Sequence, residues 1–466
     1  MKFPLFLFLV VIVNTSVSSQ NKQFIYGFQD IPQSLLENPG GEVFFDKHIG
    51  IPFLSGVYLN VGTNNGLISG LFTNDGVAIN NKFQSIIHSL STKDFFSVNE
   101  QLDIVNIGYR LQNEKDYLSF GIYQEFDFIS YHPKDIAILF YQGNTDGNGN
   151  TDLNSTYALN DANIKGEMIG VFHAGISRRV NNKFTIGARA KLYSGVFNFQ
   201  SHHNRGLISS RLDQGNNVQH LINNADVTFN SSGLTKSANK TFASNTFRSL
   251  FFGGNLGLGL DVGFTYRLKD NMTLSASLLD LGFISYSNDV NTYKVKGDVE
   301  INGIGVIDPP TDNTLDYWEN LNIDFHSQVP IDTLHSTYLS FRSPKINTSF
   351  MYKFGRYYSS LACNDSSKLN NKTYKNEVGI QSFFIFRPIK PQMAASLFYT
   401  RRLSNIFKAK IMYTADAYTF SNIGLGLSSQ LGKFNLFAAA DNVLGYSNIY
   451  STKKISFSFG MNLVFE

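Results

Sequence analysis

The sequence predicts an all-β protein, a single transmembrane antiparallel β-barrel of about 14 strands within a range of 12 to 16. Three observations predict this fold. The N-terminus has the features of an export leader. Apolar and polar residues then alternate over many segments of about ten residues. Charged residues make up only 16% of the chain, whereas a soluble protein normally carries more charge on its surface.

The N-terminal residues have the three parts of a secretory signal peptide. Met1-Lys2 supplies the positive start, Phe3 to Val13 is an apolar run, and Val17-Ser18-Ser19 offers small residues for cleavage. The run is too short for a membrane anchor, which needs about 20 residues. Cys363 is the only cysteine, so the leader has no lipid attachment site and an intramolecular disulfide is excluded. We expect residues 1–19 to be a signal peptide and the mature chain to be exported.

The alternation gives each segment one apolar face. In 255–267 every even position is apolar, and in 454–465 the odd positions are apolar. The opposite faces are rich in Gly, Ser, Thr and Asn, as the lumen of an outer-membrane barrel requires. An exported sandwich or propeller also alternates and is the remaining alternative. Outer-membrane lipid and the barrel assembly machinery are therefore the expected partners.

Sixteen segments are candidate strands, and we expect 14 to form the barrel because bacterial barrels close with even numbers. The runs 218–230 and 291–302 lack a clean apolar face and are expected in loop hairpins. Residues 20–50 are expected to form a periplasmic or plug segment, and 51–466 the barrel, with long external loops at 200–247 and 303–335. Short helices are expected at 83–90 and 133–140. The candidate strands are 52–62, 97–111, 116–131, 164–180, 183–199, 218–230, 250–267, 271–286, 291–302, 336–354, 374–387, 391–402, 405–416, 422–431, 433–441 and 454–465.

Several strings of residues carry a family resemblance across nearly the whole mature chain. They are 28–40 (FQDIPQSLLENPG), 48–56 (HIGIPFLSG), 187–194 (GARAKLYS) and 278–285 (LLDLGFIS). The chain resembles an uncharacterised outer-membrane family of Bacteroidota, the domain of unknown function 5723. Asn38-Pro39 and 441–445 (DNVLG) are also similar to fatty-acid channels of the FadL type and to the PorP/SprF proteins of type IX secretion and gliding. The resemblance implies an outer-membrane location and a barrel, and no established activity.

Charged residues lie opposite the apolar face in many segments, and we expect them to line the lumen because charge facing lipid is costly. A network of paired ions that locks strands and plug together is the first interpretation, and a selectivity ring is the second. Mixed signs argue against strong ion selectivity. The expected lumen-lining residues are Arg110, Glu125, Asp127, His173, Arg189, Lys191, Asp261, Arg267, Glu377, Lys408 and Lys410.

Residues 144–152 weakly resemble a calcium loop, with candidate oxygen ligands at Asn144, Asp146, Asn148 and Asp152. The twelfth position is Ser155, so the closing Glu is missing and a plain turn is the simpler interpretation. His202-His203 suits one metal poorly because neighbouring side chains in an extended chain point apart. We therefore expect no cofactor.

These observations limit the function. Lys+Arg number 39 against 36 Asp+Glu, so no basic field invites nucleic acid. A membrane hydrolase could pair His173 with a serine, but the chain has no Gly-x-Ser-x-Gly elbow, and no enzyme is expected. We expect an outer-membrane barrel that forms a channel for small or hydrophobic solutes. The alternative is an accessory scaffold with secretion or surface partners.

Overall fold

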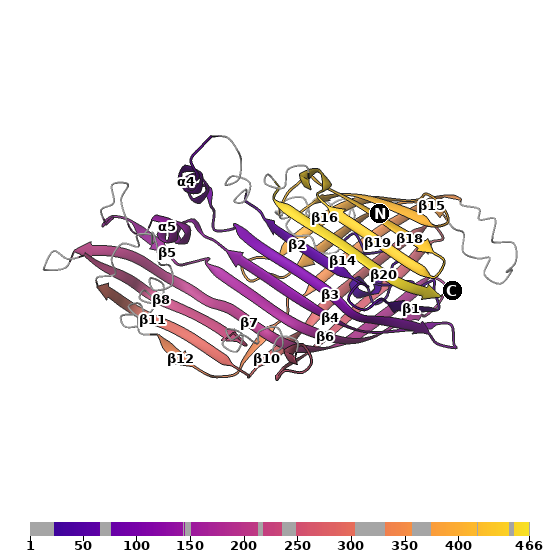
Figure 1. Cartoon of the computed structure of the whole chain (residues 1–466), viewed down its shortest axis with the longest axis horizontal. Helices are drawn as coiled ribbons and strands as arrows, with labels where there is room; N and C mark the ends of the chain where they lie inside the picture. Colours follow the sequence, from indigo (N-terminus) through magenta and orange to yellow (C-terminus); the bar gives the residue numbers. More distant parts are fainter. Residues whose placement is uncertain are drawn as a thin grey trace, which may run out of the picture.

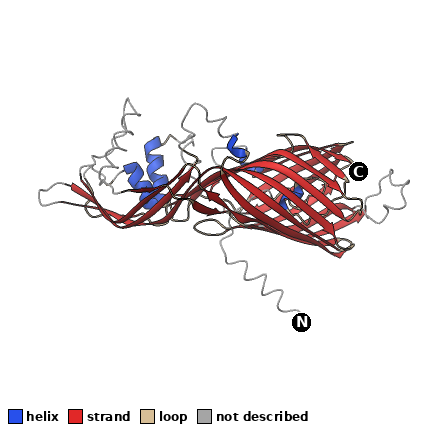
Figure 2. Ribbon diagram, turned by 90° about the horizontal axis from the view of Figure 1, so that it is seen from below, coloured by secondary structure: helices blue, strands red, loops and turns tan. Residues whose placement is uncertain are grey.

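The structure is a computed structural model that describes residues 23–65, 76–142, 144, 151–212, 218–234, 248–302, 331–356, 374–416, 418–446 and 452–465. Antiparallel strands close into a barrel with 14 positions, as the sequence predicts, and additional strands extend from one end (Figures 1 and 2). The barrel strands are β1 (Lys47–Gly50), β2 (Val57–Thr63), β3 (Phe95–Arg110), β4 (Asp116–Tyr131), β6 (Asn163–Arg179), β7 (Phe184–Leu212), β9 (Asn255–Lys269), β10 (Met272–Tyr286), β13 (Tyr338–Phe341), β14 (Lys345–Arg356), β15 (Tyr374–Ile385), β16 (Gln392–Arg402), β17 (Phe407–Ala415), β18 (Asn422–Leu431), β19 (Phe434–Asp441) and β20 (Lys454–Phe465).

Two of the 14 positions are each shared by two successive strands. β1 and β2 both pair with β3 on one side and β20 on the other, which closes the barrel. The strand expected at 52–62 therefore begins later, at Val57, and a separate strand at 47–50 was not expected. Pro52 has no N–H to donate to a ladder, and Phe53 has φ of 62°, so the chain leaves the sheet between the two halves. β13 and β14 similarly share a position beside β10.

The outer face of the barrel is apolar, as the alternation predicts. Leu258, Ile380 and Leu397 are exposed by 61%, 54% and 54% on β9, β15 and β16. Their sequence neighbours Gly259, Gln381 and Ser396 lie on the inner face of the sheet. No helix in the described part of the chain is long and apolar enough to span a membrane. A closed sheet with an apolar exterior satisfies every ladder hydrogen bond, which is the requirement for crossing lipid with strands.

The two ends of the barrel differ. Short turns at 111–115, 180–183, 270–271, 403–406 and 432–433 mark one end, called here the short-turn end. At the other end β7 continues for 29 residues in total and, beyond the barrel, pairs with β8 (Val218–Ser232) and β5 (Thr156–Ala158). β11 (Val290–Asn302) pairs with β8, and β12 (Asp332–Leu334) pairs with β11. These strands form an extension sheet (Figure 1).

The extension sheet changes the expectation for 200–247. Strand pairing occupies 200–212 and 218–232 in place of an open loop. β8 and β11 pair with each other outside the 14 positions, so leaving both out of the barrel count is confirmed. Helices α4 (Ile79–Ser89) and α5 (Lys134–Gln142) lie beside the extension and confirm the two short helices (Figure 2).

Candidate functional site inside the barrel

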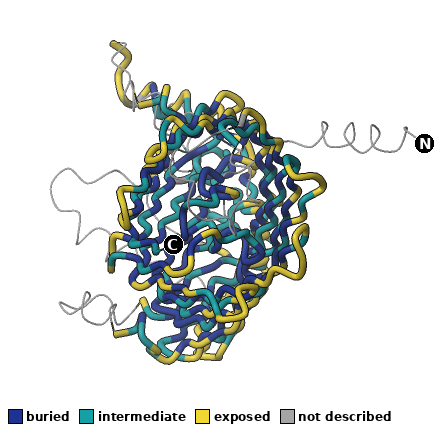
Figure 3. Tube along the Cα trace, turned by 90° about the vertical axis from the view of Figure 1, so that its right-hand side faces the viewer, coloured by how far each residue is buried: buried dark blue, intermediate teal, exposed yellow. Residues whose placement is uncertain are grey.

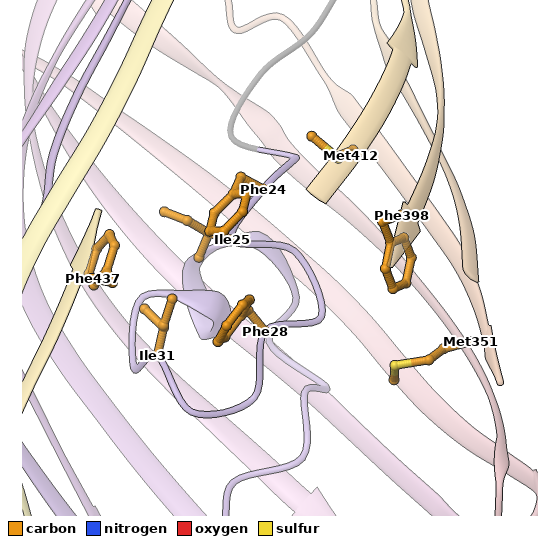
Figure 4. Packing of buried hydrophobic residues seen from close by; sticks show 8 residues of the cluster. All are labelled: Phe24, Ile25, Phe28, Ile31, Met351, Phe398, Met412 and Phe437. Atoms are coloured by element: carbon orange, nitrogen blue, oxygen red, sulfur yellow. The ribbon is translucent and has the colours of Figure 1, made fainter. Parts of the chain in front are cut away.

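Residues 23–46 lie inside the ring of strands (Figure 3). Residues 23–46, called here the inner segment, fold into successive turns and one short helix, α2 (Ser34–Glu37). Four apolar side chains of this segment pack against the wall in one buried cluster (Figure 4). The cluster contains Phe24, Ile25, Phe28 and Ile31 of the inner segment and Met351, Phe398, Met412 and Phe437 of the wall.

Glycines in the wall make room for this segment. A Cβ on Gly426 would lie 1.9 Å from the ring of Phe24. A Cβ on Gly187 would lie 2.0 Å from the carbonyl oxygen of Pro39, and one on Gly40 would lie 2.3 Å from that of Gly263. These distances are shorter than any normal van der Waals contact. The inner segment can follow this path only because the glycines have no side chain.

Barrel side chains hold the inner segment by donating hydrogen bonds to its carbonyl groups. Arg189 donates to the carbonyls of Leu35 and Leu36, the latter at 3.1 Å. Lys410 Nζ donates to the carbonyls of Phe24 at 2.8 Å and Tyr26 at 3.3 Å. Further bonds come from Gln381 to Gln23, Ser277 to Glu37, Ser177 to Gly41, and Arg110 to Val43 and Phe45.

The inner segment is therefore attached through side chains and not through a strand ladder. Within the described residues, its backbone bonds from 23 to 45 are turns within the segment itself, and the first backbone bond to the wall is Asp46 N–H to Phe465. Ion pairs add to the attachment: Asp30 with Lys408, Glu42 with Arg267 at 2.5 Å, and Asp46 with Arg110 at 3.1 Å. Displacing this segment would leave every barrel ladder intact.

The lumen wall has an apolar patch, which alternation did not predict. Strands β14, β15, β16, β17 and β19 each point at least one large apolar side chain inward, although barrel lumens are usually polar. These buried side chains are Met351, Phe383, Ile385, Phe398, Met412 and Phe437. Phe24 and its apolar neighbours in the inner segment cover part of this apolar wall.

The lumen also carries a continuous network of ion pairs. Asp261 contacts Arg189 at 3.0 Å and Lys191 at 2.9 Å. Lys191 continues to Asp280 at 2.6 Å, and Asp280 to Lys345 at 2.8 Å. Glu125 then joins Lys345 at 3.3 Å and Arg342 at 2.9 Å, and Arg342 pairs with Glu167. Four acids balance four bases, so the network crosses the lumen without net charge.

A β-bulge places Asp280 in this network. The register between β9 and β10 shifts between Leu278 and Leu281, and Asp280 has φ of 59°, a conformation that Asp tolerates better than most residues. Its N–H donates to Asp261 at 2.7 Å. Strict alternation from Leu278 would turn Asp280 toward lipid, so the bulge is what directs this carboxylate inward.

Two small cavities lie between the inner segment and the wall. One of about 30 Å³ is lined by residues that include Glu37, Glu125, Lys191 and Arg387. The other, of about 20 Å³, is lined by residues that include Gln33, Asp103 and Phe437. Each has room for about one water molecule, which is far less than a solute needs.

The remaining expected lumen residues also face inward. Asp127 pairs with Arg387 at 2.6 Å, and Glu377 lies 3.8 Å from Lys353. His173 is buried beside the ring of Tyr123, and its Nδ1 has no hydrogen-bond partner among the described residues. No serine contact that would make it a catalytic base is found there.

The calcium candidate falls largely outside the described residues, because Asp146 and Asn148 are not among them. Asn144 donates to Ser210, and Asp152 accepts from Ser155, whose hydroxyl holds the pKa of Asp152 below its usual range. Across the described ranges, no group of three or more His, Cys, Asp and Glu side chains could hold a metal ion. In the extension sheet, burial lowers the pKa of His202.

Several charged residues of the lumen were not predicted from the sequence, although some of them could have been. Glu167 has the same alternation phase as His173, Lys345 that of Met351, and Arg387 that of Ile385. Alternation could have found these three. Asp280 could not be found, because no local signal announces the bulge.

A family model, described as a family of unknown function (DUF5723), matches residues 39–441. The chain belongs to this family. Its resemblance to PorP/SprF proteins and its origin in Bacteroidota stay predictions. A comparison with curated proteins finds no match.

Solved structures with a similar arrangement are outer-membrane barrels. The toluene transporter TbuX of Ralstonia pickettii has 10% identity and a TM-score of 0.40, with 93% of this chain and 94% of that chain covered. A FadL homologue of Pseudomonas aeruginosa has 9% identity and a TM-score of 0.42, covering 94% and 95%. The toluene transporter TodX of Pseudomonas putida has 11% identity and a TM-score of 0.37, covering 97% and 94%. TM-scores this low carry no argument about activity.

Proposed function

We propose that the protein is an outer-membrane passage for small hydrophobic solutes, closed by the inner segment in the conformation described. The carrying observation is the apolar patch of the lumen wall, around Phe398, Met412 and Phe437. An apolar surface of this kind inside a barrel is costly in water and is suited to an apolar solute. Phe24 and Phe28 now stand where such a solute would contact the wall.

The attachment of the inner segment supports a gate. Its polar contacts with the wall are side-chain hydrogen bonds and ion pairs, which can be exchanged for water one by one. The cavities beside it are too small for a solute. Passage therefore requires the segment to move, and the barrel ladders need not change.

Gln33 and Asn462 offer a test of this gate, because their side-chain amides form reciprocal bonds of 2.9 and 3.0 Å. In a Cys363→Ser background, Gln33→Cys and Asn462→Cys are joined by a short bifunctional thiol reagent. Uptake of a small aromatic hydrocarbon into vesicles should be lower for the crosslinked protein than for the same variant left unlinked. Equal uptake in both forms, or none in either with folding verified, contradicts the proposal.

The extension sheet favours a second candidate function, an accessory scaffold for secretion or surface partners. β7, β8 and β11 continue beyond the barrel, although closure of the barrel does not need them. Replacing 201–231 and 291–301 by short turns should abolish partner copurification and leave uptake unchanged if this function holds. Insertion would depend on the barrel assembly machinery in either case.

A further inference from the structure

An apolar groove lies on the lipid-facing side of the barrel, across β6, β7, β9, β10 and β14. It has a volume of about 690 Å³, within the range of ligand sites. Ile176, Phe184, Ile186 and Leu278 form its walls. Small residues, among them Ala188 and Ala276, form its floor, so the groove is a dent in a surface otherwise covered by large side chains.

A line of basic residues lies at the short-turn end of this groove. Lys115, Arg178, Arg179, Lys183 and Lys269, called here the basic arc, are all exposed. Arg178 itself lines the groove.

Backbone hydrogen bonds connect the arc across neighbouring strands. The N–H of Arg179 donates to the carbonyl of Lys115 at 2.9 Å, and that of Arg267 donates to the carbonyl of Lys183 at 2.7 Å. The five cations therefore follow one another along the rim, from the turn before β4 to the end of β9.

Three acids lie next to the arc in the sequence, and the arc remains positive. Asp116 accepts a bidentate pair from Nε and Nη2 of Arg178, both at 2.6 Å, and the other two acids are Glu114 and Asp270. Five bases against three acids leave an excess of two positive charges beside an apolar groove.

We propose that the groove and the basic arc bind an anionic phospholipid from the leaflet that meets the short-turn end. Its acyl chains lie in the groove over Ala188 and Ala276, and its phosphate meets the arc at Lys183 and Lys269. The apolar part of such a lipid matches the lining of the groove, and its charge matches the arc. This inference concerns the outer wall and does not depend on passage through the lumen.

A second copy of the chain is the less suitable occupant. A two-fold dimer presents the same patch from both subunits, so the basic arc would face itself. Anionic lipid instead neutralises the charge of the arc, and the outer face of the barrel is already in contact with lipid.

Native mass spectrometry of the folded, full-length protein tests the site, with added phosphatidylglycerol compared with phosphatidylcholine. Wild type should retain one phosphatidylglycerol preferentially. Lys183→Gln with Lys269→Gln should weaken this binding about 30-fold at low salt, from the effect expected of two surface lysines. Arg401→Gln with Lys433→Gln, at the same end but outside the arc, is the matched control and should leave binding unchanged.

The groove is tested separately from the charges. Ala276→Leu fills its floor and should reduce retention of the lipid, whereas Ala438→Leu places the same side chain on the lipid face of β19 and should not. Equal retention of the two lipids, or equal effects of site and control variants, overturns the proposal. A dimer that is lost only in Ala276→Leu would also overturn it, in favour of a second copy.

Discussion

Lys191 and Asp280 form an ion pair of 2.6 Å inside the barrel, although regular alternation would point the Asp280 side chain to lipid. The pair exists because a bulge at Asp280 changes the direction of β10. It joins Arg189 and Asp261, beside the inner segment, to Lys345 and Glu125 on β14 and β4. Attachment of the inner segment and the ion network are thus coupled through one irregularity of one strand.

Asp280→Asn should destabilise the barrel strongly. Asn tolerates the same backbone conformation, so the substitution removes only the charge and leaves Lys191 and Lys345 with less compensation. Breaking a buried pair typically costs about 3–5 kcal/mol. Urea unfolding in lipid vesicles measures the loss. Glu300→Gln removes an exposed pair with Arg211 in the extension sheet and should cost at most about 1 kcal/mol.

Arg189→Met should loosen the inner segment. The guanidinium donates to the carbonyls of Leu35 and Leu36 and pairs with Asp261, and Met keeps much of its volume without these bonds. Limited proteolysis should cut within 23–46 faster than in wild type, while heat-modifiable migration still shows a closed barrel. Arg211→Met is the control, and equal cleavage in both variants would contradict this role for Arg189.

Gly426→Ala and Phe24→Ala should not be additive. The new methyl group of Gly426→Ala would collide with the ring of Phe24, and overpacking costs about 1–3 kcal/mol. Phe24→Ala alone leaves a cavity that costs about 3–5 kcal/mol. In the double variant the methyl group enters the space of the ring, so the total should be smaller than the sum. Additive unfolding free energies would show that the two residues do not meet.

Leu258→Arg should impair insertion into vesicles. Leu258 is 61% exposed on the apolar belt, where an Arg costs up to about 2–4 kcal/mol, the value at the middle of the bilayer. Leu212→Arg, at the end of β7 beyond the barrel, should have little effect because this residue stands outside the belt. The folded fraction after dilution into vesicles distinguishes the two. Similar losses would mean that the extension also contacts lipid.

Much of the candidate site follows from alternation. Glu125, Asp127, Arg189, Lys191 and Asp261 face inward because each sits one residue from a lipid-facing side chain, and a period of two needs no tertiary information. The same rule indicates which segments are strands. It also indicates that β8 and β11, whose apolar faces are weak, lie outside the 14 barrel positions.

The apolar patch of the lumen was missed for a different reason. Ile385 lies between Phe384 and Phe386, lipid-facing residues that are also apolar, so this end of β15 has no contrast between its faces. A strand that is apolar on both faces has the pattern of a strand buried on both faces. The sequence does not indicate which part of the chain packs against the inner face. Phe383 and Ile385 pack with Ala394 of β16, and Gln381 on the same face of β15 bonds to Gln23 of the inner segment, more than 300 residues away in the chain.

The sequence by itself determined the class of fold, the number of barrel positions and the inward direction of most charges, because these depend on the two-residue period of a strand and on the cost of exposing charge to lipid. Only the tertiary structure decided which charges pair, where the bulge directs Asp280, that an apolar wall faces Phe24, and that a groove meets the basic arc. These features arise where strands distant in sequence meet, and register and curvature there are set by the closed barrel as a whole.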